Sequence, residues 1–284
     1  MSTETLSSSN SPVASGLGGD GRVGVWPDAV EAAAKYQSPE WALVWHDEFE
    51  RNGLPDPAKW TFEEGRVRNN EAQFYTAARE ANASISDGCL SLVARREIWE
   101  GADYTSASIT TKGRFDFTYG KLQMRARVPA GRGTWPALWT IAADYPHHPW
   151  PGCGEIDLME HVGFLPNRFH YTVHTEAYNH VRKIQRGAFE ELDPVADAGF
   201  RDYGLIWSRD RLEWFADGVK VFEYRDDGTG PDVWPFFRPQ YLLISLAVGG
   251  SWGGMEGIDE TAFPAALEIE HVRVWQLPEP ERSR

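Results

Sequence analysis

The sequence predicts an all-β protein, built mainly from antiparallel strands that form a sandwich. Short segments rich in β-branched and aromatic residues, such as 121–128 and 267–275, alternate with Gly, Pro, Asp and Asn. The pairs Asp87-Gly88, Asp217-Gly218 and Asp227-Gly228 are typical of hairpin turns. No stretch keeps a helical period over several turns, so strands joined by turns are the predicted elements.

The chain is predicted to be one domain with two tails. We expect a flexible N-terminal tail over residues 1–40, the folded domain over 41–277 and a C-terminal tail over 278–284 that frays. Asp28, as a cap, and the Ala-rich residues after it suggest a short helix within the first tail. Residues 186–199 are acidic and irregular, which predicts a surface loop.

Composition argues against several classes of partner. The 284 residues carry a formal net charge of −14, which argues against nucleic acid and anionic membranes and disfavours a strongly anionic substrate. No apolar run approaches the roughly 18 residues of a membrane span. The 13 Trp residues would offer flat apolar rings to the faces of sugars, although Trp also belongs in cores.

The most informative feature is a run of three carboxylates, Glu155, Asp157 and Glu160, separated by apolar residues. On an extended strand Glu155 and Asp157 point to one face, and Glu160 falls on the other. A β-bulge near Leu158 and Met159 would return Glu160 to the acidic face, and bulges are common beside active sites. The pattern predicts a line of carboxylates on one sheet face, as a retaining glycosidase needs. The alternative is an acidic surface cluster, which a chain with 42 acidic residues produces easily.

The two cysteines define neither a disulfide scaffold nor a metal site. Cys89 and Cys153 are too few for a disulfide framework and lack the spacing of metal ligands, so we expect both to be free. Cys153 lies close to the carboxylates, but no evident Ser, His and Asp partner set around it supports a nucleophilic thiol.

Several separate segments match one known family in the same order. They are 43–49 (LVWHDEF), 69–76 (NNEAQFYT), 109–113 (ITTKG), 117–120 (FTYG), 135–139 (WPALW), 155–160 (EIDLME), 174–180 (HTEAYNH) and 247–252 (AVGGSW). The chain resembles glycoside hydrolase family 16, and within it the laminarinase-type endo-β-1,3-glucanases, over about residues 41–276. The resemblance implies a β-jelly roll of two antiparallel sheets, of which the concave one forms an open cleft for a polysaccharide.

The resemblance also implies roles for individual residues. Glu155 would be the nucleophile, Glu160 the general acid/base, and Asp157 the carboxylate between them that adjusts their protonation. Substrate contacts would come from Trp135, Trp139, His174, Asn69, Glu71 and Trp252. The alternatives are core positions for the three Trp residues, a structural role for His174, a turn for Asn69 and a surface position for Glu71.

The resemblance implies no cofactor for the chemistry, although the family often carries a structural calcium on the convex face. Glu48, the backbone oxygen of Gly88 and Glu270 stand at the matching positions, and the alternative is that all three are ordinary surface residues. We expect a monomer. The resemblance suggests a secreted protein, whereas residues 1–21 show no recognisable signal peptide.

The expected function is hydrolysis of internal β-1,3-glucosidic bonds in a neutral glucan with retention of configuration. Mixed-linkage glucan is an alternative substrate, and so are agar-type and carrageenan-type galactans, on which relatives with the same bulged motif act. A sulfated chain would need basic groups such as Arg68 and Arg182 in the cleft. A non-catalytic glucan-binding module is a further alternative, but it would lack one or both glutamates, and both are present here.

Overall fold

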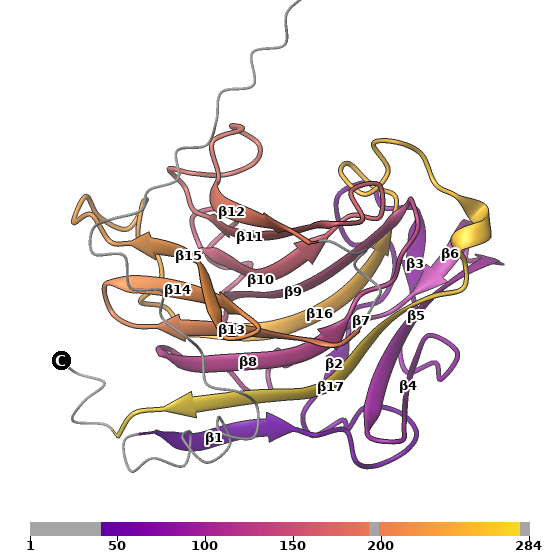
Figure 1. Cartoon of the computed structure of the whole chain (residues 1–284), viewed down its shortest axis with the longest axis horizontal. Helices are drawn as coiled ribbons and strands as arrows, with labels where there is room; N and C mark the ends of the chain where they lie inside the picture. The colour runs from indigo at the N-terminus through magenta and orange to yellow at the C-terminus, as the bar shows by residue number, and fades with distance from the viewer. Residues whose placement is uncertain (1–40, 193–198, 279–284) are drawn as a thin grey trace, which may run out of the picture.

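The computed structural model describes residues 41–192 and 199–278, which form two stacked β-sheets (Figure 1). This arrangement confirms the predicted all-β sandwich. The only helical element among these residues is the 3₁₀ helix η2 (Glu260–Ala262). No helix in this described part of the chain is long and apolar enough to cross a membrane. The expected tail over 1–40, with its short helix, and residues 279–284 lie outside the described residues.

The larger sheet has ten strands, and the long strand β17 is the centre of its pairing. The spatial order is β15 (Val219–Arg225), β14 (Arg211–Ala216), β13 (Arg201–Trp207), β8 (Gly120–Arg127), β17 (Ala265–Gln276), β5 (Cys89–Trp99), β6 (Ala102–Ser106) and β3 (Gln73–Tyr75). In addition, β1 (Ala42–Asp47) pairs with β17, and β4 (Ala83–Ser86) pairs with β5. The pair β3–β6 is parallel, which is an exception in a sandwich that is otherwise antiparallel, as predicted.

The smaller sheet has seven strands and positions the candidate site. Its spatial order is β12 (Arg186–Glu191), β11 (Arg168–His174), β10 (Glu155–His161), β9 (Thr134–Ala142), β16 (Gln240–Val248), β7 (Ser108–Thr110) and β2 (Thr61–Phe62). The strand pairs of this sheet are antiparallel. One of its faces packs on the larger sheet, and we call the opposite face the outer face.

Two of the three predicted hairpin turns are confirmed. Asp87-Gly88 joins β4 to β5 and Asp217-Gly218 joins β14 to β15, and all four residues have positive φ, as two-residue hairpins of this hand require. The prediction for Asp227-Gly228 is wrong, because this pair opens a long connection from β15 to β16, which do not pair. Aspartate side chains stabilise that turn, with Asp226 accepting from Gly228 N at 2.9 Å.

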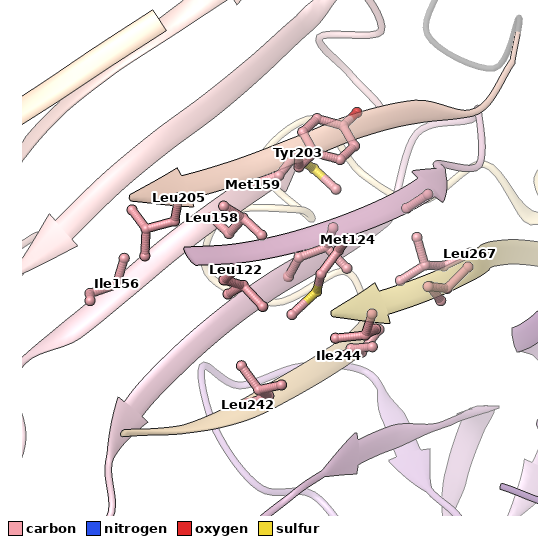
Figure 2. Packing of buried hydrophobic residues seen from close by; sticks show 14 of the residues in the cluster. Leu122, Met124, Ile156, Leu158, Met159, Tyr203, Leu205, Leu242, Ile244 and Leu267 are labelled. Carbon is pink, nitrogen blue, oxygen red and sulfur yellow. The ribbon is translucent and has the colours of Figure 1, made fainter. Parts of the chain in front are cut away.

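The core lies between the sheets and is made of aliphatic and aromatic side chains from both (Figure 2). The labelled residues are Leu122, Met124, Tyr203, Leu205 and Leu267 of the larger sheet and Ile156, Leu158, Met159, Leu242 and Ile244 of the smaller one. Each of them is at most 1% exposed. Because removing apolar area from water contributes about 25 cal/mol per Å², this layer is the main force that holds the two sheets together.

The predicted surface loop over 186–199 is wrong in its first half. Residues 186–191 form β12, which pairs with β11 along its whole length and is the outermost strand of the smaller sheet (Figure 1). The segment was not recognised because an edge strand buries few of its side chains and tolerates charged residues, so it lacks a hydrophobic alternation. Residues 193–198 lie outside the described residues.

Candidate active site

The three carboxylates lie on β10, which contains the predicted bulge. Asp157 and Met159 pair with consecutive residues of β9, so Leu158 is the extra residue in the ladder. Leu158 and Met159 both point into the core between the sheets (Figure 2). Because of this extra residue, Glu160 returns to the outer face that Glu155 and Asp157 occupy. The parity argument from the sequence is confirmed.

His174 lies beside the carboxylates on the neighbouring strand β11. It pairs directly with Glu155. Its Nε2 lies 3.4 Å from Asp157 Oδ2 and 3.8 Å from Glu155 Oε1. Asp157 Oδ2 and His174 Nδ1 are buried without a hydrogen-bond partner among the described residues. The expectation that His174 lies within reach of the carboxylates is confirmed, and the group keeps polar atoms available for a ligand.

Burial raises the pKa of all three carboxyl groups. Loss of solvent is the largest cause, and it raises the pKa of Glu155, Asp157 and Glu160 to about 8. The negative charge of Asp157 adds to the rise for both glutamates, and His174 opposes it. The positive charge of Arg68 also opposes the rise in the pKa of Glu155. The cluster therefore retains protons near neutral pH, so that a carboxylic acid and a carboxylate can stand side by side.

Trp135 and Trp139 of β9 both lie on the outer face. Trp135 Nε1 donates a hydrogen bond to Glu160 Oε1 at 3.0 Å. Trp139 pairs directly with Asp157, and its Nε1 donates to Ser245 Oγ at 3.2 Å. Neither ring belongs to the cluster between the sheets. The alternative that these two residues fill the main core is therefore wrong, and both rings border the carboxylates.

Arg68 covers Trp139 and comes from a distant part of the chain. The Arg68 guanidinium carbon lies 4.9 Å from the centroid of the Trp139 ring. Arg68 is paired with Glu63, whose other oxygen accepts from Ser108 Oγ at 2.7 Å. Sequence reasoning considered Arg68 only as a partner for sulfated chains. No local signal connects residues 68 and 139, because only the fold brings them together.

Asn69 and Glu71 belong to a loop held by its own hydrogen bonds. Glu71 accepts from Asn69 Nδ2 at 3.2 Å and from Gln73 Nε2 at 2.6 Å. Asn69 adopts a left-handed backbone with φ of 54°, as expected for a turn. Glu71 is buried, which contradicts the alternative of a surface position and raises its pKa. Direct contact of either residue with substrate stays a prediction.

Trp252 packs over the Glu160 end of the site. Its ring centroid lies 5.6 Å from that of Trp135 and 4.8 Å from that of His170, and both contacts are edge to face. His170 pairs directly with Glu160, so it is part of the site. Sequence reasoning missed His170, although it lies four residues before His174 on the same strand, and side chains an even number of residues apart share a face.

Side chains at the centre of the outer face are almost fully buried. Ala137 and Trp139 are each 8% exposed and Ser245 is 5% exposed, whereas Leu138 and Ile244 on the opposite face are fully buried. Side chains from loops pack on the rings of this face, with Arg68 over Trp139 and Trp252 against Trp135. A face that carries rings beside carboxylates suits a neutral sugar polymer.

The predicted calcium ligands are engaged with arginines. Glu48 accepts two hydrogen bonds from Arg273, at 2.8 and 2.7 Å, and Glu270 accepts from Arg125 at 2.6 Å. Gly88 lies in the turn between β4 and β5. Calcium binds six to eight oxygen ligands, and these carboxylates are already neutralised. The residues therefore do not fit a calcium ion in this arrangement.

Both cysteines are free, as expected. Cys153 is buried, and loss of solvent raises the pKa of its thiol to about 12. A thiol in this state has almost no thiolate character at neutral pH. Cys153 therefore packs in the same apolar cluster as Trp139 and Ile141 and is not the nucleophile of the site.

Known proteins resemble this chain in both sequence and fold. The family model described as Glycosyl hydrolases family 16 matches residues 60–264. The chain belongs to this family. A β-glucanase of Rhodothermus marinus is 44% identical over 252 residues, which cover 86% of this chain and 88% of that protein. Members of family 16 need no cofactor for catalysis.

Two solved structures of family 16 support the fold. The laminarinase from Rhodothermus marinus superposes with a TM-score of 0.81 at 44% identity, covering 84% of this chain and 98% of that chain. SCLam, a non-specific endo-β-1,3(4)-glucanase, superposes with a TM-score of 0.80 at 38% identity, covering 84% and 92%. These matches confirm the predicted β-jelly roll.

We expect Glu160→Gln to stabilise the protein at neutral pH and to have no effect at acidic pH. The pKa of Glu160 rises from 4.5 to about 8 on folding, so the native state retains a proton that the unfolded chain loses. Stability therefore falls as pH rises between these values, and Gln avoids that loss. The gain in Tm should grow as the pH rises above about 5, by about 2–4 °C for each kcal/mol gained in the free energy of unfolding.

Thermal melts at a series of pH values test this expectation. The exposed Glu80, replaced by Gln, is the control and should leave Tm unchanged at every pH. A gain in Tm for Glu160→Gln that persists at acidic pH would contradict the explanation by proton linkage.

Proposed function

We propose that this protein is a monomeric endo-β-1,3-glucanase that hydrolyses internal bonds of laminarin-type glucan with retention of configuration. The observation that carries this proposal is the bulge in β10, which places Glu155 and Glu160 on one face beside the tryptophans of β9. The names of the relatives, β-glucanase and laminarinase, support a glucan as the substrate. All of these side chains come from one chain, so a monomer suffices.

The first step forms a bond between the enzyme and the sugar. The Glu155 carboxylate attacks the anomeric carbon while Glu160 donates its proton to the glycosidic oxygen, and the bond to the leaving sugar breaks. The Trp135 N–H holds Oε1 of Glu160, which leaves the other oxygen to carry the proton. Arg68 favours the ionised form of Glu155.

The second step releases the product. Glu160, now a carboxylate, removes a proton from water, which attacks the same carbon and frees Glu155. Two inversions give overall retention. The negative charge of Asp157, 3.4 Å from His174, helps to keep the proton of the cluster on Glu160 between turnovers.

A panel of laminarin, lichenan, agarose and carrageenan tests the proposal. We expect the highest kcat/KM on laminarin, a lower value on lichenan and no release of sugars from the two galactans. Proton NMR of the first products should show the β-anomer. Preferred cleavage of a galactan, or an α-anomer as the first product, would overturn the substrate or the mechanism.

The charges around the site favour a neutral chain over a sulfated one. Arg68 is paired with Glu63, and Arg182 Nη2 is paired with Glu176 Oε1 at 2.9 Å. A sulfate would have to compete with these carboxylates for each guanidinium. The net charge of −14 adds a general repulsion of polyanions.

We expect Trp139→Ala to weaken binding of laminarin oligosaccharides about tenfold, because the ring supplies stacking area that alanine lacks. Binding is measured by calorimetry in a Glu160→Gln background, so that the ligand is not consumed. Trp99→Ala is the control, since Trp99 is a half-exposed ring on the larger sheet. A large fall in Tm with unchanged affinity would assign Trp139 a purely structural role.

We propose that arginine–carboxylate pairs occupy the positions at which the family resemblance implied a calcium site. Arg273 and Arg125 already neutralise Glu48 and Glu270. We therefore expect EDTA, or millimolar Ca²⁺, to change Tm by less than about 1 °C, because a ligand that does not bind the native state cannot stabilise it. A rise in Tm with Ca²⁺ that EDTA reverses would restore the calcium prediction.

A further inference from the structure

A row of aromatic rings leads from the general acid/base to the outer edge of the smaller sheet. Trp135, which donates to Glu160, contacts Trp252 at 5.6 Å between ring centroids, and Trp252 contacts His170 at 4.8 Å. His170 contacts Phe189 of β12 at 6.0 Å.

Strand register places Phe189 on the same face as the acid/base. Glu160 pairs with His170, and His170 pairs with Phe189. Directly opposed residues of antiparallel strands share a face. Because neighbouring strands lie about 4.8 Å apart, Phe189 lies about 10 Å from Glu160 across the sheet.

The ring of Phe189 is partly open to solvent. The residue is 50% exposed. The guanidinium carbon of Arg168 lies 4.2 Å from the ring centroid, and Arg168 is paired with Glu191. Along β12, Phe189 lies between Glu191 and Gly187 on the same face, and Gly187 pairs with Thr172. A Cβ at Gly187 would lie 2.5 Å from a backbone oxygen of β11, so the position requires glycine.

We propose that Phe189 is a stacking platform for a sugar ring on the leaving-group side of the cleaved bond, and that Gly187 keeps access to it open. The proposal rests on the proposed function. Glu160 protonates the leaving oxygen, so the sugar that departs lies on its side of the site. An exposed flat ring, already continuous with the rings around Glu160, suits the apolar face of a neutral sugar.

The test compares two substrates that differ in what occupies the leaving-group side. Laminarihexaose places sugars there, whereas p-nitrophenyl laminaribioside places only a small activated leaving group. For Phe189→Ala we expect the ratio of kcat/KM on the hexaose to that on the aryl glycoside to fall about three- to tenfold. Phe189→Trp should restore the ratio, because it restores an aromatic surface.

Trp99→Ala is the matched control. Trp99 is also a partly exposed ring on which an arginine stacks, with Arg79 at 4.6 Å, but it lies on β5 of the larger sheet. Its replacement should leave the ratio unchanged. An unchanged ratio for Phe189→Ala, or a ratio that falls equally for Trp99→Ala, would overturn the proposal. Failure of the wild-type protein to cleave laminarihexaose would instead refute the proposed function.

Discussion

Glu155→Gln and Glu160→Gln should each remove nearly all glucanase activity while the protein stays folded. General acid/base catalysis contributes about 10²–10⁴-fold, and we expect Glu160→Gln to lose an amount in that range on laminarin. Glu155→Gln should lose at least as much, because no covalent intermediate can form. Gln preserves the shape of either side chain and removes only the ionisable group. Initial rates on laminarin, with circular dichroism to confirm folding, measure both effects.

A second substrate separates the two roles. An aryl glycoside with a very good leaving group needs little protonation, so Glu160→Gln should lose much less rate on it than on laminarin. Glu155→Gln should be equally inactive on both substrates. Glu80→Gln, at an exposed position, is the control for the substitution itself. If an activated 2-fluoro-glycoside labelled a residue other than Glu155, the assignment of the nucleophile would be wrong.

Deletion of Met159 should abolish activity more completely than its replacement. When Met159 is deleted, Leu158 takes its place in the ladder and no extra residue remains. Strand β10 then becomes a regular strand in which Glu160 still faces outward. Its position along the strand then changes by a fraction of the residue rise of about 3.3 Å, and catalytic geometry tolerates less than about 1 Å. The hydrogen bond from Trp135 to Glu160 would also be lost. We expect a fall in kcat of more than about a hundredfold.

Two point variants separate this register effect from the loss of core packing. Met159 is fully buried, so Met159→Ala leaves a cavity and should cost about 2–5 kcal/mol of stability while β10 keeps its bulge. Activity of the folded fraction should survive. Met159→Leu conserves volume and should cost less than about 1.5 kcal/mol. A deletion variant that keeps wild-type kcat would show that the bulge does not aim Glu160.

The sequence determined the chemistry and most of the framework of this protein. The Asp-Gly pairs at 87–88 and 217–218 specify their hairpins locally, because both residues must adopt positive φ. The spacing of Glu155, Asp157 and Glu160 demanded a bulge, since side chains alternate along a strand and only an extra residue restores the face. Each of these inferences depends on a few consecutive residues and on the geometry of one element.

Only the tertiary structure decided the surroundings of the carboxylates. Strand β12 carries no hydrophobic alternation and exists because β11 offers it an edge to pair with. The contact of Arg68 with Trp139, and the arginine pairs of Glu48 and Glu270, join residues that are far apart in the chain. The row from Glu160 through His170 to Phe189 follows from strand register. Register and long-range contacts depend on the packing of the whole sandwich, so no local pattern in the sequence encodes them.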